Sequence, residues 1–214
     1  MWKPKDITSP AIEKYLYSLL PKSDAVLRDM EKYAYARDIP IVGPAVGRLF
    51  FLLTQLAGAK RIFEMGSAIG YSTLWFAQAS GEGGEVHYSD GSEDNAKRAR
   101  DYFHRAALAD RIHIHVGVAQ RKLAETSGEF DIIFIDVDKQ QYPETLKQAV
   151  PRIRRGGLLL ADNTLWSGRA ARKAPRGDAH TMGIQQFNRA VYASADLYPA
   201  MIPLRDGLTI CRKL

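Results

Sequence analysis

Two carboxylates, an amide and a lysine occupy positions where they could hold a cation and move a proton. Asp136 ends a mostly apolar run that starts at Phe130, and Asp162 and Asn163 end a second run that starts at Gly157. The carboxyl ends of parallel strands meet at one edge of a sheet, so we expect the three side chains to lie together. Oxygen donors without histidine or cysteine suit Mg²⁺ first, with Mn²⁺ or Ca²⁺ as alternatives. Solvated strand-end caps are the other interpretation.

Lys139 follows Asp136 by three residues. A lysine near a divalent cation and low-dielectric walls can have its pKa lowered enough to act as a general base. An isolated lysine is usually a solvated surface charge. The prediction that Lys139 is catalytic therefore depends on its neighbours.

A glycine-hinged turn precedes these groups, in the segment RIFEMGSAIGYSTLWFA at positions 61–77. Gly66 and Gly70 bracket the turn, but their spacing is not the G-x-G-x-x-G dinucleotide fingerprint. Glu64 would oppose a pyrophosphate, whereas it suits a cationic ligand such as the sulfonium and ammonium groups of S-adenosylmethionine. We expect Ser72 or Thr73 to cap the helix that follows. A surface turn with a solvated glutamate is the alternative.

Two later strand ends have side chains suited to an adenosine. Asp90 ends the second strand candidate, where a carboxylate can accept both ribose hydroxyls. Gly117 to Gln120 follows the third strand candidate, so Ala119 could offer its backbone N–H and Gln120 its amide to a base edge. A helix-start aspartate and a solvent-facing glutamine are the alternatives.

The elements that position these residues change type along the chain. Periodicity, prolines and candidate N-caps at Ser9 and Ser23 predict helices at residues 10–20, 23–36 and 43–56. From Arg61 onward, short apolar runs alternate with helical segments, which predicts a parallel sheet with right-handed crossovers. The predicted strands span 61–65, 84–89, 111–116, 130–136 and 157–161, and the predicted helices span 72–79, 93–107, 141–153 and 181–195. A terminal hairpin, 197–203 and 208–212, would add antiparallel strands around an Asp206-Gly207 turn.

Length and composition favour one domain of 214 residues, with a helical extension at 1–58 and a doubly wound core at 59–214. The net charge of +6 is spread along the chain, so we expect no nucleic-acid partner. A single cysteine, Cys211, excludes an internal disulfide framework and favours a cytoplasmic setting. The N-terminal MWKPKDITSP lacks the apolar region of a secretory signal, and no segment has the length of a membrane span.

Four segments together resemble the cation-dependent, S-adenosylmethionine-dependent O-methyltransferases of the catechol and caffeoyl-CoA type. FEMGSAIGYSTLWFA is similar to that family's first cofactor motif and FIDVDKQQY to its metal-and-lysine motif. LLLADNTLWSG is similar to the second metal motif and DGLTICRKL to the C-terminal strand. The similarity runs from about Tyr15 to Leu214. It implies a Rossmann-like class I methyltransferase sheet, mostly parallel, and a homodimer.

The resemblance also implies roles for individual residues. Asp136, Asp162 and Asn163 would hold the cation, and Lys139 would remove the proton of a catechol-like acceptor. Lys139 and Asp136 are thus the predicted catalytic residues. The predicted cofactor site comprises Val42, Glu64, Gly66, Ser67, Gly70, Tyr71, Ser72, Asp90, Ala119, Gln120 and Asp136.

Three places depart from the family pattern. Val118 stands where relatives often carry a polar or small residue, so the adenine contacts need not match theirs. Pro203 falls near the place where animal catechol enzymes carry an acidic residue, so their acceptor clamp does not transfer. The segment 166–180, in the place of the acceptor lid, carries four basic residues that could favour an anionic acceptor, or form a solvated loop: Arg169, Arg172, Lys173 and Arg176.

Two rival functions remain open at this stage. A nucleotide-binding oxidoreductase on a similar sheet would bind NAD, although its glycine fingerprint is absent. A non-catalytic module would bind the cofactor and act through partners, with the helical N-terminus as a docking element. Turnover of a catechol separates both from an O-methyltransferase.

Overall fold

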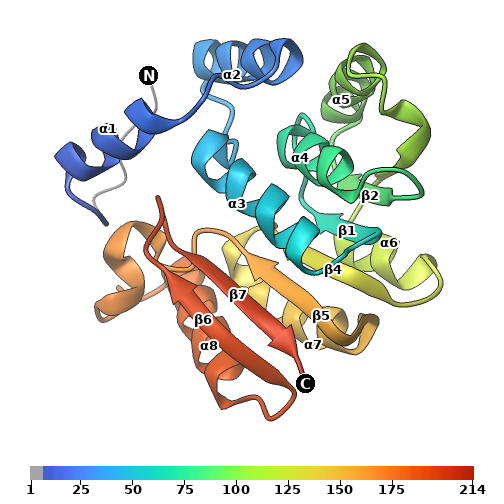
Figure 1. The fold of residues 1–214 in the computed structure, drawn as a ribbon. Helices are drawn as coiled ribbons and strands as arrows, with labels where there is room; N and C mark the ends of the chain where they lie inside the picture. Colours follow the sequence, from blue (N-terminus) through green and yellow to red (C-terminus); the bar gives the residue numbers. More distant parts are fainter. Residues whose placement is uncertain (1–6) are drawn as a thin grey trace.

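The computed structural model describes residues 7–214, and its core is a seven-stranded sheet (Figure 1). The strands are β1 (Arg61–Met65), β2 (Glu85–Asp90), β3 (Ile112–Val116), β4 (Phe130–Ile135), β5 (Ile153–Ala161), β6 (Leu197–Ile202) and β7 (Leu208–Lys213). Their order is β3-β2-β1-β4-β5-β7-β6, and β7 runs antiparallel to both of its neighbours while the other pairings are parallel. The predicted mostly parallel α/β sheet with an antiparallel C-terminal hairpin is confirmed.

Helices precede the sheet and connect its strands. They are α1 (Pro10–Leu19), α2 (Ala25–Arg37), α3 (Gly43–Leu56), α4 (Tyr71–Ser80), α5 (Glu93–Arg105), α6 (Ala119–Glu125), α7 (Tyr142–Ala149) and α8 (Ala179–Ala193). Short 3₁₀ segments are η1 (Ala109–Arg111), η2 (Lys139–Gln141), η3 (Val150–Arg152) and η4 (Trp166–Ala171). None of the helices within residues 7–214 combines the length and apolar character that crossing a bilayer requires. Residues 1–6, on which the predicted absence of a secretory signal partly depends, lie outside the described residues.

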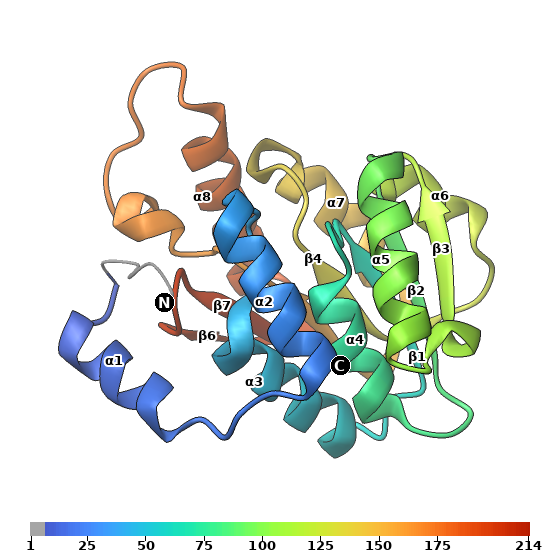
Figure 2. The same cartoon turned by 90° about the horizontal axis from the view of Figure 1, so that it is seen from above.

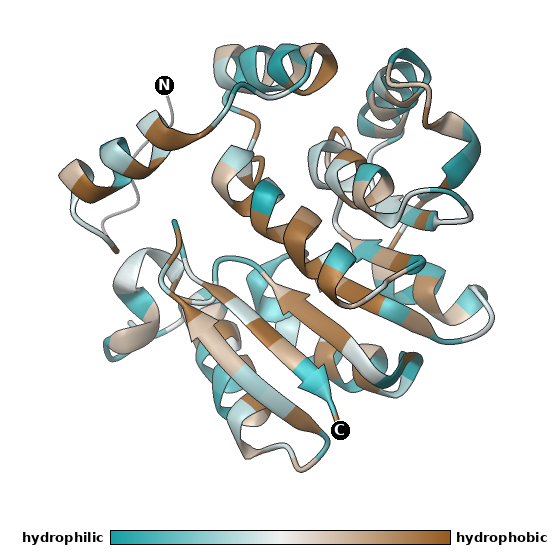
Figure 3. Cartoon of the chain, viewed as in Figure 1, coloured by the Kyte–Doolittle hydropathy of each residue, from teal (hydrophilic) through white to brown (hydrophobic). Residues whose placement is uncertain are grey.

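Alternation along the strands gives the sheet two buried faces. In β1, Ile62 packs into the core shared with α2 to α5, whereas Phe63 packs into the core shared with α6, α7 and α8. In β4, Phe134 and Ile133 divide between the same two cores. Successive strand residues point to opposite faces, so an apolar run covered on both sides has no polar face. Figure 2 shows the helices on either side of the sheet, and Figure 3 shows the apolar colouring of α3 and the strands beneath it.

The capping predictions were right at one helix and wrong at two. The Ser9 side chain caps α1 as predicted. Asp24, rather than Ser23, caps α2 by accepting from the Leu27 N–H at 2.9 Å. The cap of α4 is Gly70, with φ 84°, because its left-handed backbone turns the chain into the helix one residue before Ser72.

Boundaries after β4 also differ from the prediction. The predicted helix at 141–153 is interrupted, because α7 ends at Ala149 and Pro151 lies in η3, where a proline cannot continue α-helical hydrogen bonding. Strand β5 consequently begins at Ile153, four residues before its predicted start. The seven-residue helix α6 was missed, since Ala119 and Leu123 are the only side chains of that helix that are buried.

Candidate functional site

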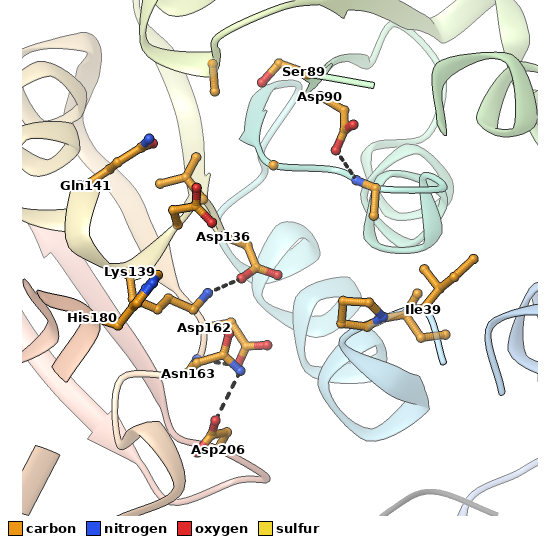
Figure 4. Close-up of a pocket in the computed structure, with 18 of the residues that line it drawn as sticks. Ile39, Ser89, Asp90, Asp136, Lys139, Gln141, Asp162, Asn163, His180 and Asp206 are labelled. Atoms are coloured by element: carbon orange, nitrogen blue, oxygen red, sulfur yellow. Dashed lines mark hydrogen bonds and ion pairs between the residues drawn. The ribbon is translucent and has the colours of Figure 1, made fainter. Parts of the chain in front are cut away.

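A pocket of about 890 Å³ opens where the parallel strands end (Figure 4). The turn after β1 contributes Gly66, and the end of β2 contributes Asp90. The segments after β4 and β5 contribute Asp136 and Asp162. The prediction that these strand ends converge at one sheet edge is confirmed, because all of them line this pocket.

Gly66 brings the first turn against the end of β4. Its φ is 92°, and a Cβ built there would lie 2.3 Å from the Asp136 carbonyl oxygen. The Asp136 N–H also donates to the Met65 carbonyl at 2.8 Å. Only glycine allows this backbone-to-backbone approach.

Asp90 is held in the pocket wall by several donors. Its carboxylate accepts from the Ala68 N–H at 2.9 Å, from the Ser92 N–H at 2.8 Å and from the Asn95 amide at 3.0 Å. A carboxylate offers about four acceptor positions, so capacity is left for a ligand. Its place fits the predicted ribose contact.

Ala119 and Gln120 also line the pocket, as their predicted adenine role requires. The Gln120 side-chain nitrogen donates to Gln141 Oε1 at 3.0 Å and to Thr145 Oγ1 at 2.8 Å. These bonds orient the amide and tie α6 to α7. Gln120 is therefore held by protein partners rather than facing only solvent.

Glu64 lies behind the pocket wall. Its side chain is fully buried, and the hydroxyls of Ser72 and Thr73 both donate to its carboxylate. Burial, opposed by these hydrogen bonds, raises the pKa of Glu64 to about 7. The charge that was expected to face a ligand is instead enclosed by β1 and α4. The hydroxyls of Ser72 and Thr73 hydrogen-bond to this carboxylate and do not cap the helix.

Five further predicted cofactor residues belong to the same supporting layer. Within the described residues, the pocket lining excludes Val42, Ser67, Gly70, Tyr71 and Ser72. The Tyr71 hydroxyl donates to Glu31 Oε1 at 2.7 Å, and the Ser67 hydroxyl accepts from the Ser89 N–H at 3.1 Å. Their contacts in the structure shape the wall from behind, and direct cofactor contact by them stays a prediction.

Glu64→Gln should change the pH dependence of stability. The folded-state pKa of about 7 lies above the ordinary value of 4.5, so native Glu64 binds protons more readily than the unfolded chain does. Wild-type stability should therefore fall as pH rises from about 4.5 to above 7. The stability of the variant should not show this decrease. At pH 8 we expect Glu64→Gln to be more stable by roughly 1–3 kcal/mol.

Urea denaturation at pH 5 and pH 8 measures this difference, with the exposed Glu82→Gln as the matched control. A variant less stable than wild type at pH 8 would contradict the expectation. Titration of the same variant with S-adenosylhomocysteine tests the predicted cofactor contact of Glu64, which a roughly tenfold loss of affinity would support.

The metal-and-lysine segment forms a connected polar cluster (Figure 4). The Lys139 Nζ lies 2.6 Å from Asp136 Oδ1 and donates to the Tyr142 hydroxyl at 3.0 Å. The Tyr142 hydroxyl lies 2.9 Å from the Asp162 carbonyl, to which it donates. Tyr142 thus links the loop after β4 to the end of β5. It was not predicted as a site residue, although it is the last residue of the FIDVDKQQY segment.

The charges of this cluster shift one another's pKa. Burial and then the charge of Asp136 raise the pKa of Asp162 to about 6. Burial also raises the pKa of Asp136, against the opposing effect of Lys139. Burial alone would lower the pKa of Lys139, but Asp136 and Tyr142 outweigh it and raise the pKa above its ordinary value. The predicted lowering is therefore reversed here, because the carboxylate stabilises the ammonium.

Asp136, Asp162 and Asn163 fit a divalent cation. Asp162 is buried beside the partly exposed Asp136, whose charge raises the pKa of Asp162, and a cation would relieve this repulsion. Asn163 adopts φ 57°, and its amide nitrogen lies 3.5 Å from Asp206 Oδ2. That contact directs the amide oxygen away from Asp206 and leaves it available as a third oxygen donor. The donor chemistry is that of Mg²⁺ sites.

The opposite wall of the pocket comes from elements distant in sequence. Trp166 and His180 line it, with their rings stacked at a centroid distance of 6.1 Å. The Arg205 guanidinium donates to the carbonyls of Ile41, at 2.8 Å, and Val42. Asp206 is buried and accepts from the Ser167 N–H. Arg205 and Asp206 were predicted only as turn residues, and a charged pair in a tight turn was their only sequence signal.

The four basic residues of the 166–180 segment do not line the pocket in the described structure. Arg169, Arg172, Lys173 and Arg176 are all exposed. This matches the solvated loop and gives no support to their contact with an anionic acceptor. The cationic side chains of the pocket wall are Lys139 and Arg205.

Comparison with known proteins places this geometry in a family. The family model described as O-methyltransferase matches residues 21–214. Tricin synthase 1 of Oryza sativa is 29% identical over 226 residues, covering 97% of this chain and 90% of that protein. The O-methyltransferase of Bacillus cereus, solved in complex with SAH, superposes with a TM-score of 0.87 at 29% identity, covering 95% of this chain and 97% of that one. The O-methyltransferase TomG of Streptomyces achromogenes, solved with SAM, superposes with a TM-score of 0.87 at 26% identity and covers 100% and 99% of the two chains.

Proposed function

Because the chain belongs to the O-methyltransferase family and is an S-adenosylmethionine-dependent methyltransferase, we propose that its acceptor is a catechol-like small molecule and that turnover depends on a divalent cation. The family match removes the reason for the oxidoreductase alternative. One observation carries the finer proposal: Asp136, Lys139, Asp162 and Asn163 line the same pocket as Asp90. Donor and acceptor sites would thus share one cavity.

In this proposal the methyl donor and the acceptor bind at different ends of the pocket. Asp90, Ala119 and Gln120 would bind the adenosine part of the methyl donor. Gly66 would allow the donor's methionine part to approach the strand ends. Aligning two bound reactants contributes a large part of the rate of a group transfer.

The acceptor end would hold two adjacent hydroxyls. Asp136, Asp162 and Asn163 would bind the cation, which lowers the pKa of an acceptor hydroxyl and offsets the carboxylate charge that now raises the pKa of Lys139. Lys139 would then take the proton of the hydroxyl that attacks the methyl group. Trp166 and His180 supply ring surfaces suited to a flat aromatic acceptor.

Removal of divalent cations should abolish turnover of a catechol panel. We expect activity in EDTA to fall by at least about 100-fold and to return with Mg²⁺ or Mn²⁺, because the buried carboxylates would otherwise repel an ionised acceptor. S-adenosylhomocysteine binding by calorimetry is the control and should persist in EDTA.

Unchanged turnover in EDTA would contradict the cation dependence and leave methyl transfer standing. Cofactor binding with no turnover of any diol under Mg²⁺ would instead favour the non-catalytic module.

Two further expectations belong to this proposal. We expect a homodimer, and α1 supports it because Ile12, Tyr15 and Leu19 are each more than half exposed. A second copy of the chain could cover this apolar face. We also expect a cytoplasmic protein, because a single cysteine, Cys211, allows no internal disulfide framework.

A further inference from the structure

A second cluster of metal-binding side chains lies on β2 and β3, away from the pocket. Glu85 is the first residue of β2, whereas the pocket lies at the other end of that strand. His87 follows two residues later on the same face, and His113 of β3 is its direct register partner. Two histidines and a glutamate thus meet near the β3 edge of the sheet.

The distances within this cluster are longer than those of good hydrogen bonds. They are close to the distance between two ligands of one metal ion. His87 Nε2 lies 3.5 Å from Glu85 Oε1, and His113 Nε2 lies 3.5 Å from Glu85 Oε2. One ligand atom from each residue lies within 4.8 Å of the others. N–H···O hydrogen bonds peak near 2.9 Å. Ligands about 2.1 Å from a tetrahedral Zn²⁺ lie about 3.4 Å from one another.

A second layer of contacts orients His87. Its Nδ1 lies 3.0 Å from His115 Nε2, and the Phe63 ring stacks on it at a centroid distance of 5.9 Å. Metal-binding histidines are commonly fixed in this way, by a hydrogen bond at the nitrogen that does not bind the metal. Burial lowers the pKa of His87 to about 4, so the ring is neutral at pH 7 and one nitrogen has a free lone pair.

We propose that Glu85, His87 and His113 bind a transition-metal ion of the Zn²⁺ class. Imidazole and carboxylate donors select such ions over Mg²⁺. The His113 side chain is 51% exposed, which gives the ion a route from solvent and leaves a fourth position for water. Arg61 pairs with Glu85 Oε1, which faces His87, whereas Oε2 faces His113, so the two carboxylate oxygens each face one histidine. The site would tie β3 to β2, and it shares no residue with the pocket.

Titration of the whole protein with Zn²⁺ in excess Mg²⁺ tests this site, since Mg²⁺ would compete for the proposed oxygen-donor site and not for the histidines. We expect one Zn²⁺ per chain by calorimetry, and a Co²⁺ absorption spectrum typical of nitrogen and oxygen ligands. His113→Ala should weaken Zn²⁺ binding at least tenfold, and Glu85→Gln should weaken it as well. The thermal midpoint of wild type should rise with Zn²⁺ and that of His113→Ala should not.

His104→Ala is the matched control, because His104 is exposed on α5, which packs on the opposite face of the sheet. It should bind Zn²⁺ like wild type. Absence of Zn²⁺ binding under excess Mg²⁺, or equal affinity in wild type and His113→Ala, would overturn the proposal. Neither result bears on methyl transfer.

Discussion

Lys139→Met should lower kcat for catechol methylation by roughly 10²–10⁴-fold, the range for loss of a positioned general base. Methionine keeps most of the length of the lysine side chain but can neither pair with Asp136 nor accept a proton. S-adenosylhomocysteine binding should change little, since Asp90 and Ala119 lie at the other end of the pocket. Steady-state kinetics together with calorimetry measure both quantities.

Loss of the ion pair could by itself destabilise the site, because Lys139 lies 2.6 Å from Asp136 and is only 7% exposed. Lys139→Arg separates the two effects, since arginine keeps the positive charge but does not give up its proton. We expect the arginine variant to fold like wild type and to lose turnover as the methionine variant does. Lys147→Met, at an exposed lysine paired with Glu144, is the matched control. Full activity in Lys139→Arg would remove Lys139 as the base.

Asp162→Asn should abolish turnover and at the same time stabilise the metal-free protein. The pKa of Asp162 rises from 3.8 to about 6 through burial and the charge of Asp136. The native state therefore binds more protons than the unfolded chain between those values, and stability is lost as pH rises through this window. Asparagine does not titrate, so the variant keeps its stability as pH rises. At pH 8 without metal, its free energy of unfolding should exceed that of wild type by roughly 1–3 kcal/mol.

Denaturant unfolding in EDTA and in Mg²⁺ checks this prediction. Mg²⁺ should raise the unfolding midpoint of wild type and leave that of Asp162→Asn unchanged, while turnover of the variant falls at least about 100-fold. Equal Mg²⁺ stabilisation of both proteins would contradict the ligand role of Asp162. A variant less stable than wild type in EDTA would contradict the repulsion between the two carboxylates.

The strands and their chemistry were predictable because each strand carries its own local signal. The run Ile132–Ile135 is apolar without interruption, and a carboxylate follows at Asp136. Parallel topology then brings Asp136, Asp162 and Asn163 to one edge without any long-range information. The break at Pro151 was also available in the sequence, and the prediction of one long helix overlooked it.

The rest of the pocket depends on contacts that no local pattern encodes. The Arg205 guanidinium reaches the carbonyls of Ile41 and Val42 across more than 160 residues of chain. Glu64 appeared as a free strand-end charge, because its two hydroxyl partners become neighbours only when α4 packs on β1. The direction of the Lys139 pKa likewise depends on a distance, 2.6 Å to Asp136, which residue spacing does not fix.

The contact between Gly66 and Asp136 sets how rigidly the two halves of the pocket are joined. Both partners are backbone atoms, and a Cβ at Gly66 would overlap the Asp136 carbonyl. The distance between the turn that contains Gly66 and the loop that contains Asp136 is therefore set by main-chain atoms. No change of side-chain rotamer can adjust it. A methyl transfer needs three atoms in line, and a shift of about 1 Å can reduce such a rate by about 100-fold. Folding itself would thus supply the alignment, so that acceptors differing in size could be accommodated at the Trp166 wall without disturbing the reaction axis.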